Sequence, residues 1–162
     1  MKPLEPPDSL HLQAAQGWCE LQAFVEADVE LDKITASLRA HPKVLEVRWQ
    51  IYANLEKWAG ALDIASAIVK LEPDWPNGWI YRASSLTELN RQQEAYETLG
   101  AAAALFPTDK IILYDLACIC CTLKRVDEAR LWLGKAIETG GNEIKLRALD
   151  DEDLEPLWKE VG

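Results

Sequence analysis

Residues 79–107, "WIYRASSLTELNRQQEAYETLGAAAALFP", contain the pattern that decides the fold. Their apolar positions follow helical spacing, as do those of 45–52 and 62–69, which are separated by a polar break at Glu56 and Lys57. No stretch of the sequence alternates with a period of two, so no β-strands are expected. The pattern predicts an all-α protein built from pairs of antiparallel helices.

The helix pair recurs with a period of thirty-four residues when the chain is written in rows that start at Asp8. Since one helix pair cannot bury its own apolar face, the rows must stack on one another in a solenoid. An alanine in the second helix of each row permits the close approach that such packing needs. The small or apolar columns are Ala27, Ala61, Ala95 and Ala129; Ala15, Trp49, Ala83 and Ala117; Leu31, Ala65, Leu99 and Leu133; Ile34, Ile68, Ala102 and Ala136; and Leu21, Leu55, Leu89 and Leu123.

The rows are punctuated by prolines and by the Gly140-Gly141 pair, which end one helix or begin the next. Residues 1–7 are expected to form a flexible N-terminus, and all remaining residues to belong to one domain. The expected repeats are 8–41, 42–75, 76–109 and 110–141.

Residues 142–162 are expected to form capping helices, because the last unit of a solenoid needs a polar outer face. Leu154 and Trp158 stand here at helical spacing among many acids. Asp151 or Asp153 would cap the final helix, since acids are favourable at a helix N-terminus.

The charge balance opposes nucleic-acid and membrane partners. Lys and Arg number 17 against 27 Asp and Glu, a net charge of -10 at pH 7, and such a surface repels phosphate backbones and anionic lipid. The N-terminal "MKPLEPPDSL" lacks the apolar core of a secretory signal, and no apolar run is long enough to span a membrane. We therefore expect a cytoplasmic protein with reduced cysteines.

Catalytic motifs are absent from the sequence. There are 2 histidines, His11 in a helix-packing column and His41 at a row boundary. No Gly-rich phosphate loop, HExxH, GxSxG or paired CxxC occurs. We expect neither enzymatic activity nor a cofactor.

The stretch "YDLACICC", residues 114–121, holds all but one of the 4 cysteines. At about 100° per residue, Cys118 and Cys121 lie roughly 60° apart on a helix, while Cys120 points about 160° away from Cys118. Three thiolates so placed cannot converge on one ion, so no metal site is expected. Cys120 shares the column of Trp18 and other large apolar residues, which predicts a buried position.

The repeat resembles the tetratricopeptide repeat (TPR) family over residues 8–141. Units of that family are thirty-four residues long and carry small, aromatic and proline residues in fixed order. His11 and Arg39 in the first row, and Trp49 in the second, depart from the family pattern. The resemblance implies a right-handed superhelix with a concave binding groove. The third row matches best, with Trp79, Ala83, Leu86, Ala95, Leu99, Ala102 and Pro107.

The resemblance also implies which residues face the groove. Co-chaperone members that capture a peptide's C-terminal carboxylate place Lys, Arg and Asn there, whereas this chain has Lys43, Asn77 and the acid Glu46, so that clamp is not expected. Apolar anchors such as Ile80 and Tyr114 suit an extended or helical segment instead. The implied groove residues are Lys43, Glu46, Gln50, Asn77, Ile80, Ser84, Ile111, Tyr114, Cys118 and Cys121.

The sequence therefore favours a protein-protein interaction module, an adaptor or scaffold that holds part of an unidentified protein or peptide in its groove. Two alternatives stay open: a small acidic chaperone of the secretion type, and a homodimer paired through a helical face bearing Trp75 and Trp79. A redox role for Cys118 and Cys121 also stays open, although no adjacent cation would lower their thiol pKa.

Overall fold

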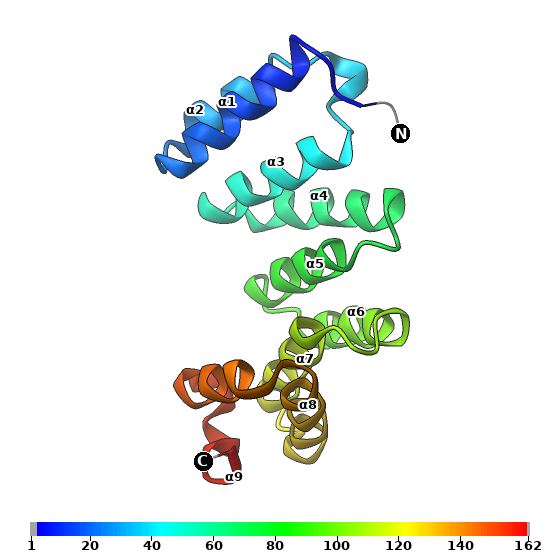
Figure 1. The fold of residues 1–162 in the computed structure, drawn as a ribbon, viewed down its shortest axis with the longest axis vertical. Helices are drawn as coiled ribbons and strands as arrows, with labels where there is room; N and C mark the ends of the chain where they lie inside the picture. Colours follow the sequence, from blue (N-terminus) through cyan, green and yellow to red (C-terminus); the bar gives the residue numbers. More distant parts are fainter. Residues whose placement is uncertain (1–2, 162) are drawn as a thin grey trace. The chain divides into compact units, whose positions relative to one another are not determined.

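The computed structural model describes residues 3–161, and every regular element in that range is helical (Figure 1). This confirms the predicted all-α fold class of antiparallel helix pairs. The α-helices are α1 (Asp8–Glu20), α2 (Phe24–Leu31), α3 (Pro42–Asn54), α4 (Trp58–Leu71), α5 (Pro76–Glu88), α6 (Gln92–Leu105), α7 (Lys110–Thr122), α8 (Val126–Asp150) and α9 (Trp158–Val161). The 3-10 helices are η1 (Ala36–Leu38) and η2 (Glu152–Leu157).

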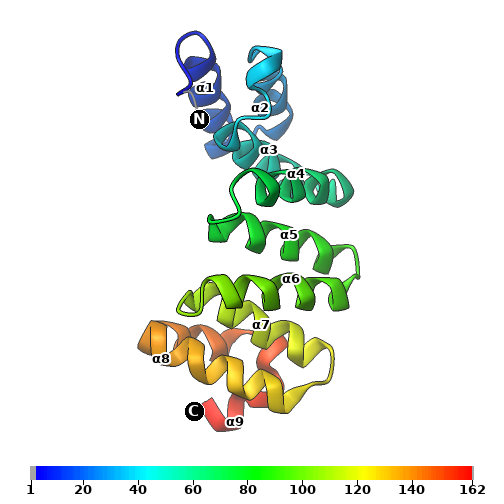
Figure 2. The ribbon, with the colours of Figure 1, turned by 90° about the vertical axis from the view of Figure 1, so that its right-hand side faces the viewer.

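The chain divides into two compact units, Met1–Pro73 and Asp74–Gly162. The first unit holds the pairs α1–α2 and α3–α4, and the second holds α5–α6, α7–α8 and the C-terminal elements (Figure 2). Two α-helices begin within each expected repeat, and α8 continues beyond the expected boundary at residue 141 to Asp150. The single domain expected for the whole chain stays a prediction.

The turn inside each helix pair repeats with the thirty-four-residue period. In the third pair, the Asn90 amide donates to the Thr87 carbonyl and the Arg91 amide donates to the Leu86 carbonyl, both at 2.9 Å. Equivalent bonds occur in the other three pairs, and they form the Schellman arrangement that satisfies the last carbonyls of a helix. One residue of each turn takes a positive φ, between 56° and 63°. These residues are Gln22, Glu56, Asn90 and Lys124.

The alanine column in the second helices is confirmed as core. Ala27, Ala61, Ala95 and Ala129 all have 0% of their surface exposed. Paired helices approach closely, as Gly60 demonstrates, because a Cβ placed there would lie 2.8 Å from the Tyr52 ring. Small residues thus allow the helices of a pair to meet without voids.

The first helix pair departs from the others, as its weak match to the repeat pattern suggests. Its second helix, α2, has 8 residues, whereas α4 and α6 have 14 each. Polar contacts join the loop after α2 to α1, since the Asp8 carboxylate accepts from the Thr35 amide at 2.6 Å. His11, expected at a packing position, lies 2.7 Å from Glu30 through its Nδ1 and so connects α1 to α2.

The end of the second unit turns at a kink inside α8. Gly141 has φ 62° and ψ -146°, and the helix resumes beyond it as far as Asp150. The Asp151 carboxylate then caps η2 by accepting from the Asp153 amide at 3.1 Å, as expected for one of the two candidate caps. The expected final helix is a 3-10 helix followed by one α-turn, in keeping with Pro156, which has no N–H to donate.

The segment after the kink, residues 142–158, packs back onto the second unit. Leu154 and Leu157 are 0% and 1% exposed, so they belong to its core. The Trp158 indole N–H donates to the Ala148 carbonyl at 2.9 Å and closes the segment on itself. We call residues 142–158 the capping segment.

Candidate functional site

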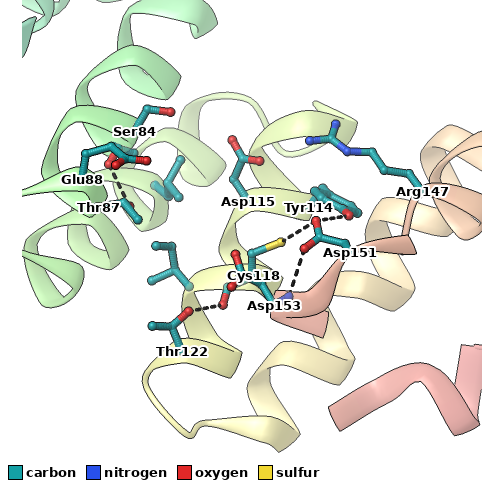
Figure 3. Close-up of a pocket in the computed structure, with 13 residues that line it drawn as sticks. Ser84, Thr87, Glu88, Tyr114, Asp115, Cys118, Thr122, Arg147, Asp151 and Asp153 are labelled. Carbon is teal, nitrogen blue, oxygen red and sulfur yellow. Dashed lines mark hydrogen bonds between the residues drawn. The ribbon is translucent and has the colours of Figure 1, made fainter. Parts of the chain in front are cut away.

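A cavity of about 220 Å³ opens in the second unit between α5, α7 and the capping segment (Figure 3). Helix α6 contributes only Leu99 to its lining. Most of the other lining residues carry a hydroxyl, carboxyl or thiol group. Its polar and ionisable residues are Ser84, Thr87 and Glu88 from α5, Tyr114, Asp115, Cys118 and Thr122 from α7, and Arg147, Asp151 and Asp153 from the capping segment.

Tyr114 joins α7 to the capping segment. Its side chain is 1% exposed, and its hydroxyl donates to Asp151 Oδ2 at 2.6 Å. The Arg147 guanidinium carbon lies 4.2 Å from the centre of the Tyr114 ring, a cation–π contact. Burial, followed by the Asp151 bond, raises the pKa of Tyr114 far above its usual range, so the phenol stays a donor at neutral pH.

Asp115 presents its carboxyl group to the cavity from the neighbouring position of α7 (Figure 3). Burial raises the pKa of Asp115 to about 7, and the positive charge of Arg147 only partly opposes that rise. Within residues 3–161, the carboxyl group receives no hydrogen bond. Near neutral pH, this group is therefore poised between its charged and neutral forms.

The predicted groove residues fall in both units. Lys43, Glu46 and Gln50 lie on α3 in the first unit, where Lys43 borders a separate cavity of about 470 Å³ near His41. In the second unit, the cavity between α5 and α7 brings together three of the predicted residues, and four others lie on the same helices outside its lining. The first three are Ser84, Tyr114 and Cys118, and the others are Asn77, Ile80, Ile111 and Cys121.

Tyr114 and Cys121, which are expected to face the groove, are both buried. They are 1% and 8% exposed, because the capping segment packs against the face of α7 that carries them. Tyr114 therefore forms a wall of the cavity and does not project as a free anchor. Cys118 stays half-buried at the cavity edge, with its Sγ 3.8 Å from Asp151 Oδ2.

Several cavity residues were missed by the sequence reasoning, notably Asp115, Arg147 and Asp151. A signal existed for Asp115, the single charged residue in the apolar run "IILYDLACICC". No comparable signal marked Arg147, since it lies beyond the last repeat and reaches α7 only through the kink at Gly141.

The thiols of α7 are poor nucleophiles. Cys120 is fully buried, as predicted, and burial raises its pKa to about 11. Burial also raises the pKa of Cys118 and Cys121, and nearby Asp151 adds to both shifts. Within the described part of the chain, no group of three or more His, Cys, Asp or Glu residues is placed to hold a metal ion.

Trp75 of the second unit and several exposed apolar side chains of the first unit bear on the predicted homodimer. Trp75, on the face proposed for pairing, packs edge-on against Tyr81, with ring centres 5.8 Å apart. In the first unit, Leu21, Val25 and Val29 are 73%, 62% and 56% exposed.

Among residues 3–161, no helix is long and apolar enough to cross a membrane.

Comparisons with known proteins connect this fold to one group of solved structures. No protein-family model matches the chain, and no curated protein matches it either. MamA 41-end from Desulfovibrio magneticus RS-1 is 16% identical, with a TM-score of 0.76 over 98% of this chain and 95% of that one. MamA AMB-1 is 21% identical, with a TM-score of 0.67 over 80% of this chain and 76% of that one. The chain therefore has the fold of MamA, a TPR-like arrangement of helix pairs.

Proposed function

We propose that the chain is a TPR protein-interaction module made of four repeats and a capping segment. Support comes from the thirty-four-residue period, which appears in the sequence columns and again in the four positive-φ turns. The fold shared with MamA agrees with this assignment. Repeat scaffolds of this kind present extended surfaces to other proteins.

The partner would bind in the second unit, and the cavity between α5, α7 and the capping segment is the observation that carries this proposal. It lies between the first helices of consecutive repeats, where Ser84 and Cys118 were expected to face a ligand. Its wall combines apolar atoms with hydroxyl and carboxyl groups, which suits a peptide side chain. Asn77, Ile80 and Ile111 would extend the contact along α5 and α7.

Selection from a displayed peptide library against the full chain tests this proposal. Ser84→Trp should fill the cavity, whereas Glu138→Trp introduces the same side chain at an exposed position of α8 outside the cavity lining. We expect selected peptides to bind the wild type and the Glu138→Trp variant alike, and to lose at least about tenfold in affinity for Ser84→Trp. Circular dichroism would verify that both variants fold. If no enriched peptide is sensitive to Ser84→Trp, the proposed site is wrong.

Self-association is a second candidate, favoured by the exposed apolar side chains of α1 and α2. Trp18, Val25 and Val29 border a shallow hollow of about 330 Å³ in the first unit. Light scattering over a concentration series would reveal a dimer, and Val25→Glu with Val29→Glu should abolish it. A wild-type chain that stays monomeric at all concentrations would exclude this candidate.

A further inference from the structure

The charge of the cavity indicates which chemical group it would bind. Four carboxyl groups line it, from Glu88, Asp115, Asp151 and Asp153, against the single guanidinium of Arg147. That guanidinium already lies over the Tyr114 ring. The cavity therefore offers negative charge in excess to whatever enters it.

The four carboxyl groups are not equivalent. Asp151 is engaged, since its oxygens accept from the Tyr114 hydroxyl at 2.6 Å and from the Asp153 amide at 3.1 Å. Glu88 and Asp153 have exposed side chains at the rim, where water solvates them. Asp115 is half-buried and, unlike Asp151, receives no hydrogen bond from residues 3–161.

A half-buried carboxylate without a hydrogen-bond donor loses part of its hydration, and this burial raises the pKa of Asp115 to about 7. A cationic donor placed beside it would restore the ionised form. Such a contact would be stronger at the half-buried Asp115 than at the exposed carboxylates of Glu88 and Asp153. Asp115 is therefore the carboxyl group best suited to serve as the counter-charge of a bound cation.

The size of the cavity favours a side chain over a free ligand. Its volume of about 220 Å³ lies below the roughly 300–1,000 Å³ of sites that enclose small molecules. Ser84 and Thr122 stand at its wall with oxygen atoms able to accept further hydrogen bonds.

We infer that the cavity binds one lysine or arginine side chain of a partner peptide, with the Asp115 carboxylate as its counter-charge. The inference rests on the proposed function, because it assigns a chemical class to the segment that binds between α5 and α7. Glu88 and Asp153 at the rim would attract the approaching cation, and Asp151 would hold the wall in place through Tyr114.

Binding should then depend on pH. The cation requires ionised Asp115, so affinity should fall by up to about tenfold per pH unit as the pH drops below about 7. The other groups facing Asp115 are Glu88 from α5, Tyr114, Cys118 and the cap Asp109 from α7, and Arg147, Asp151 and Asp153 from the capping segment. Burial keeps Tyr114 and Cys118 protonated in this range, and burial together with Asp151 raises the pKa of Asp153.

The test uses selected peptides whose binding is abolished by Ser84→Trp. In each peptide, every lysine is replaced by glutamine and every arginine by citrulline, one at a time, and affinities are measured by calorimetry. We expect one such replacement to cost at least about tenfold, and Asp115→Asn in the protein to cost a similar factor. Glu138→Gln removes the same charge from an exposed position and should leave affinity within about twofold.

Affinity measured between pH 5.5 and pH 8 gives a second readout that a merely structural role of Asp115 would not produce. We expect it to rise with pH for the wild type and to stay flat for Asp115→Asn. Peptides that are sensitive to Ser84→Trp but tolerate both the neutral replacements and Asp115→Asn would overturn this inference and leave the proposed function standing. If no peptide is sensitive to Ser84→Trp, the proposed function and this inference fail together.

Discussion

Helices α1 and α7 are each the first helix of a predicted repeat, and they differ in how much of each is buried. Both have 13 residues, yet α1 buries Asp8, Leu12 and Ala15 whereas α7 buries eight residues. Trp18 of α1 is 40% exposed, and Cys120, which stands in the same column, is 0% exposed. The capping segment accounts for part of this difference, since it packs against α7 within the second unit. Residues in the same column of the repeat can therefore differ widely in how much of their side chain is buried.

The largest expected effect is a loss of stability on truncating a buried leucine of the capping segment, compared with an exposed leucine of the first unit. Leu154→Ala removes a fully buried side chain and should lower the free energy of unfolding by about 2–5 kcal/mol. Leu21→Ala makes the same change at a side chain that is 73% exposed and should cost less than about 0.5 kcal/mol. Urea unfolding followed by circular dichroism measures both. Equal costs would contradict the role assigned to the capping segment.

The next effect is a dependence of the free energy of unfolding on pH, caused by Asp115 in the second unit. Because the pKa of Asp115 is raised to about 7, the folded state binds more protons than the unfolded state between about pH 4 and pH 7. The free energy of unfolding should therefore fall as the pH rises through this window, by at most about 1.4 kcal/mol per unit, and level off above it. Urea unfolding at pH 5, 6, 7 and 8 should reveal a slope that Asp115→Asn reduces. An identical slope in both proteins would show that Asp115 does not cause it.

A smaller effect is expected at the contact between α7 and the capping segment. Tyr114→Phe removes the donor to Asp151 and keeps the buried ring, so it should cost about 1–2 kcal/mol. Amide hydrogen exchange should become faster in residues 142–158 and stay unchanged in α1 and α2. Uniform acceleration across both units would mean that the hydroxyl does not act locally.

The smallest effect concerns the turns, in which the two units are alike. Glu56 and Asn90 both take positive φ, a conformation that glycine adopts without strain and asparagine tolerates better than glutamate. Glu56→Gly should raise the free energy of unfolding by a few tenths of a kcal/mol, and Asn90→Gly should change it less. Thermal unfolding of both variants would detect the difference. A clear loss of stability in Glu56→Gly would contradict the strain assigned to this turn.

The fold was predictable because the same helix-packing contact requires a small residue at the same position in each of the four rows of the sequence. A single alanine in a helix carries little information, but Ala27, Ala61, Ala95 and Ala129 in one column point to a close helix contact, and all four are fully buried. The turns follow the same logic, since their hydrogen bonds are local and recur in every pair.

The candidate site was predictable only in part, because some of its residues lie inside the repeats and others lie after the last repeat. Ser84 and Cys118 lie in repeat columns, and the resemblance to TPR proteins placed both in the groove. Arg147 and Asp151 lie outside the repeat, and their contacts with Tyr114 depend on the path of the chain after α8. The course of the chain after α8 depends on tertiary packing, and the repeat pattern does not predict it.

The course of the chain after α8 depends on one residue, Gly141, at the kink in that helix. Its φ of 62° with ψ of -146° lies in a region that is accessible almost only to glycine, and any other residue would hold it at a cost of about 1–3 kcal/mol. The preceding Gly140 is also constrained, because a Cβ there would clash with the side chain of Ile144. Two adjacent glycines thus set the direction in which the chain leaves the fourth helix pair, and with it the position from which Arg147 and Asp151 reach Tyr114.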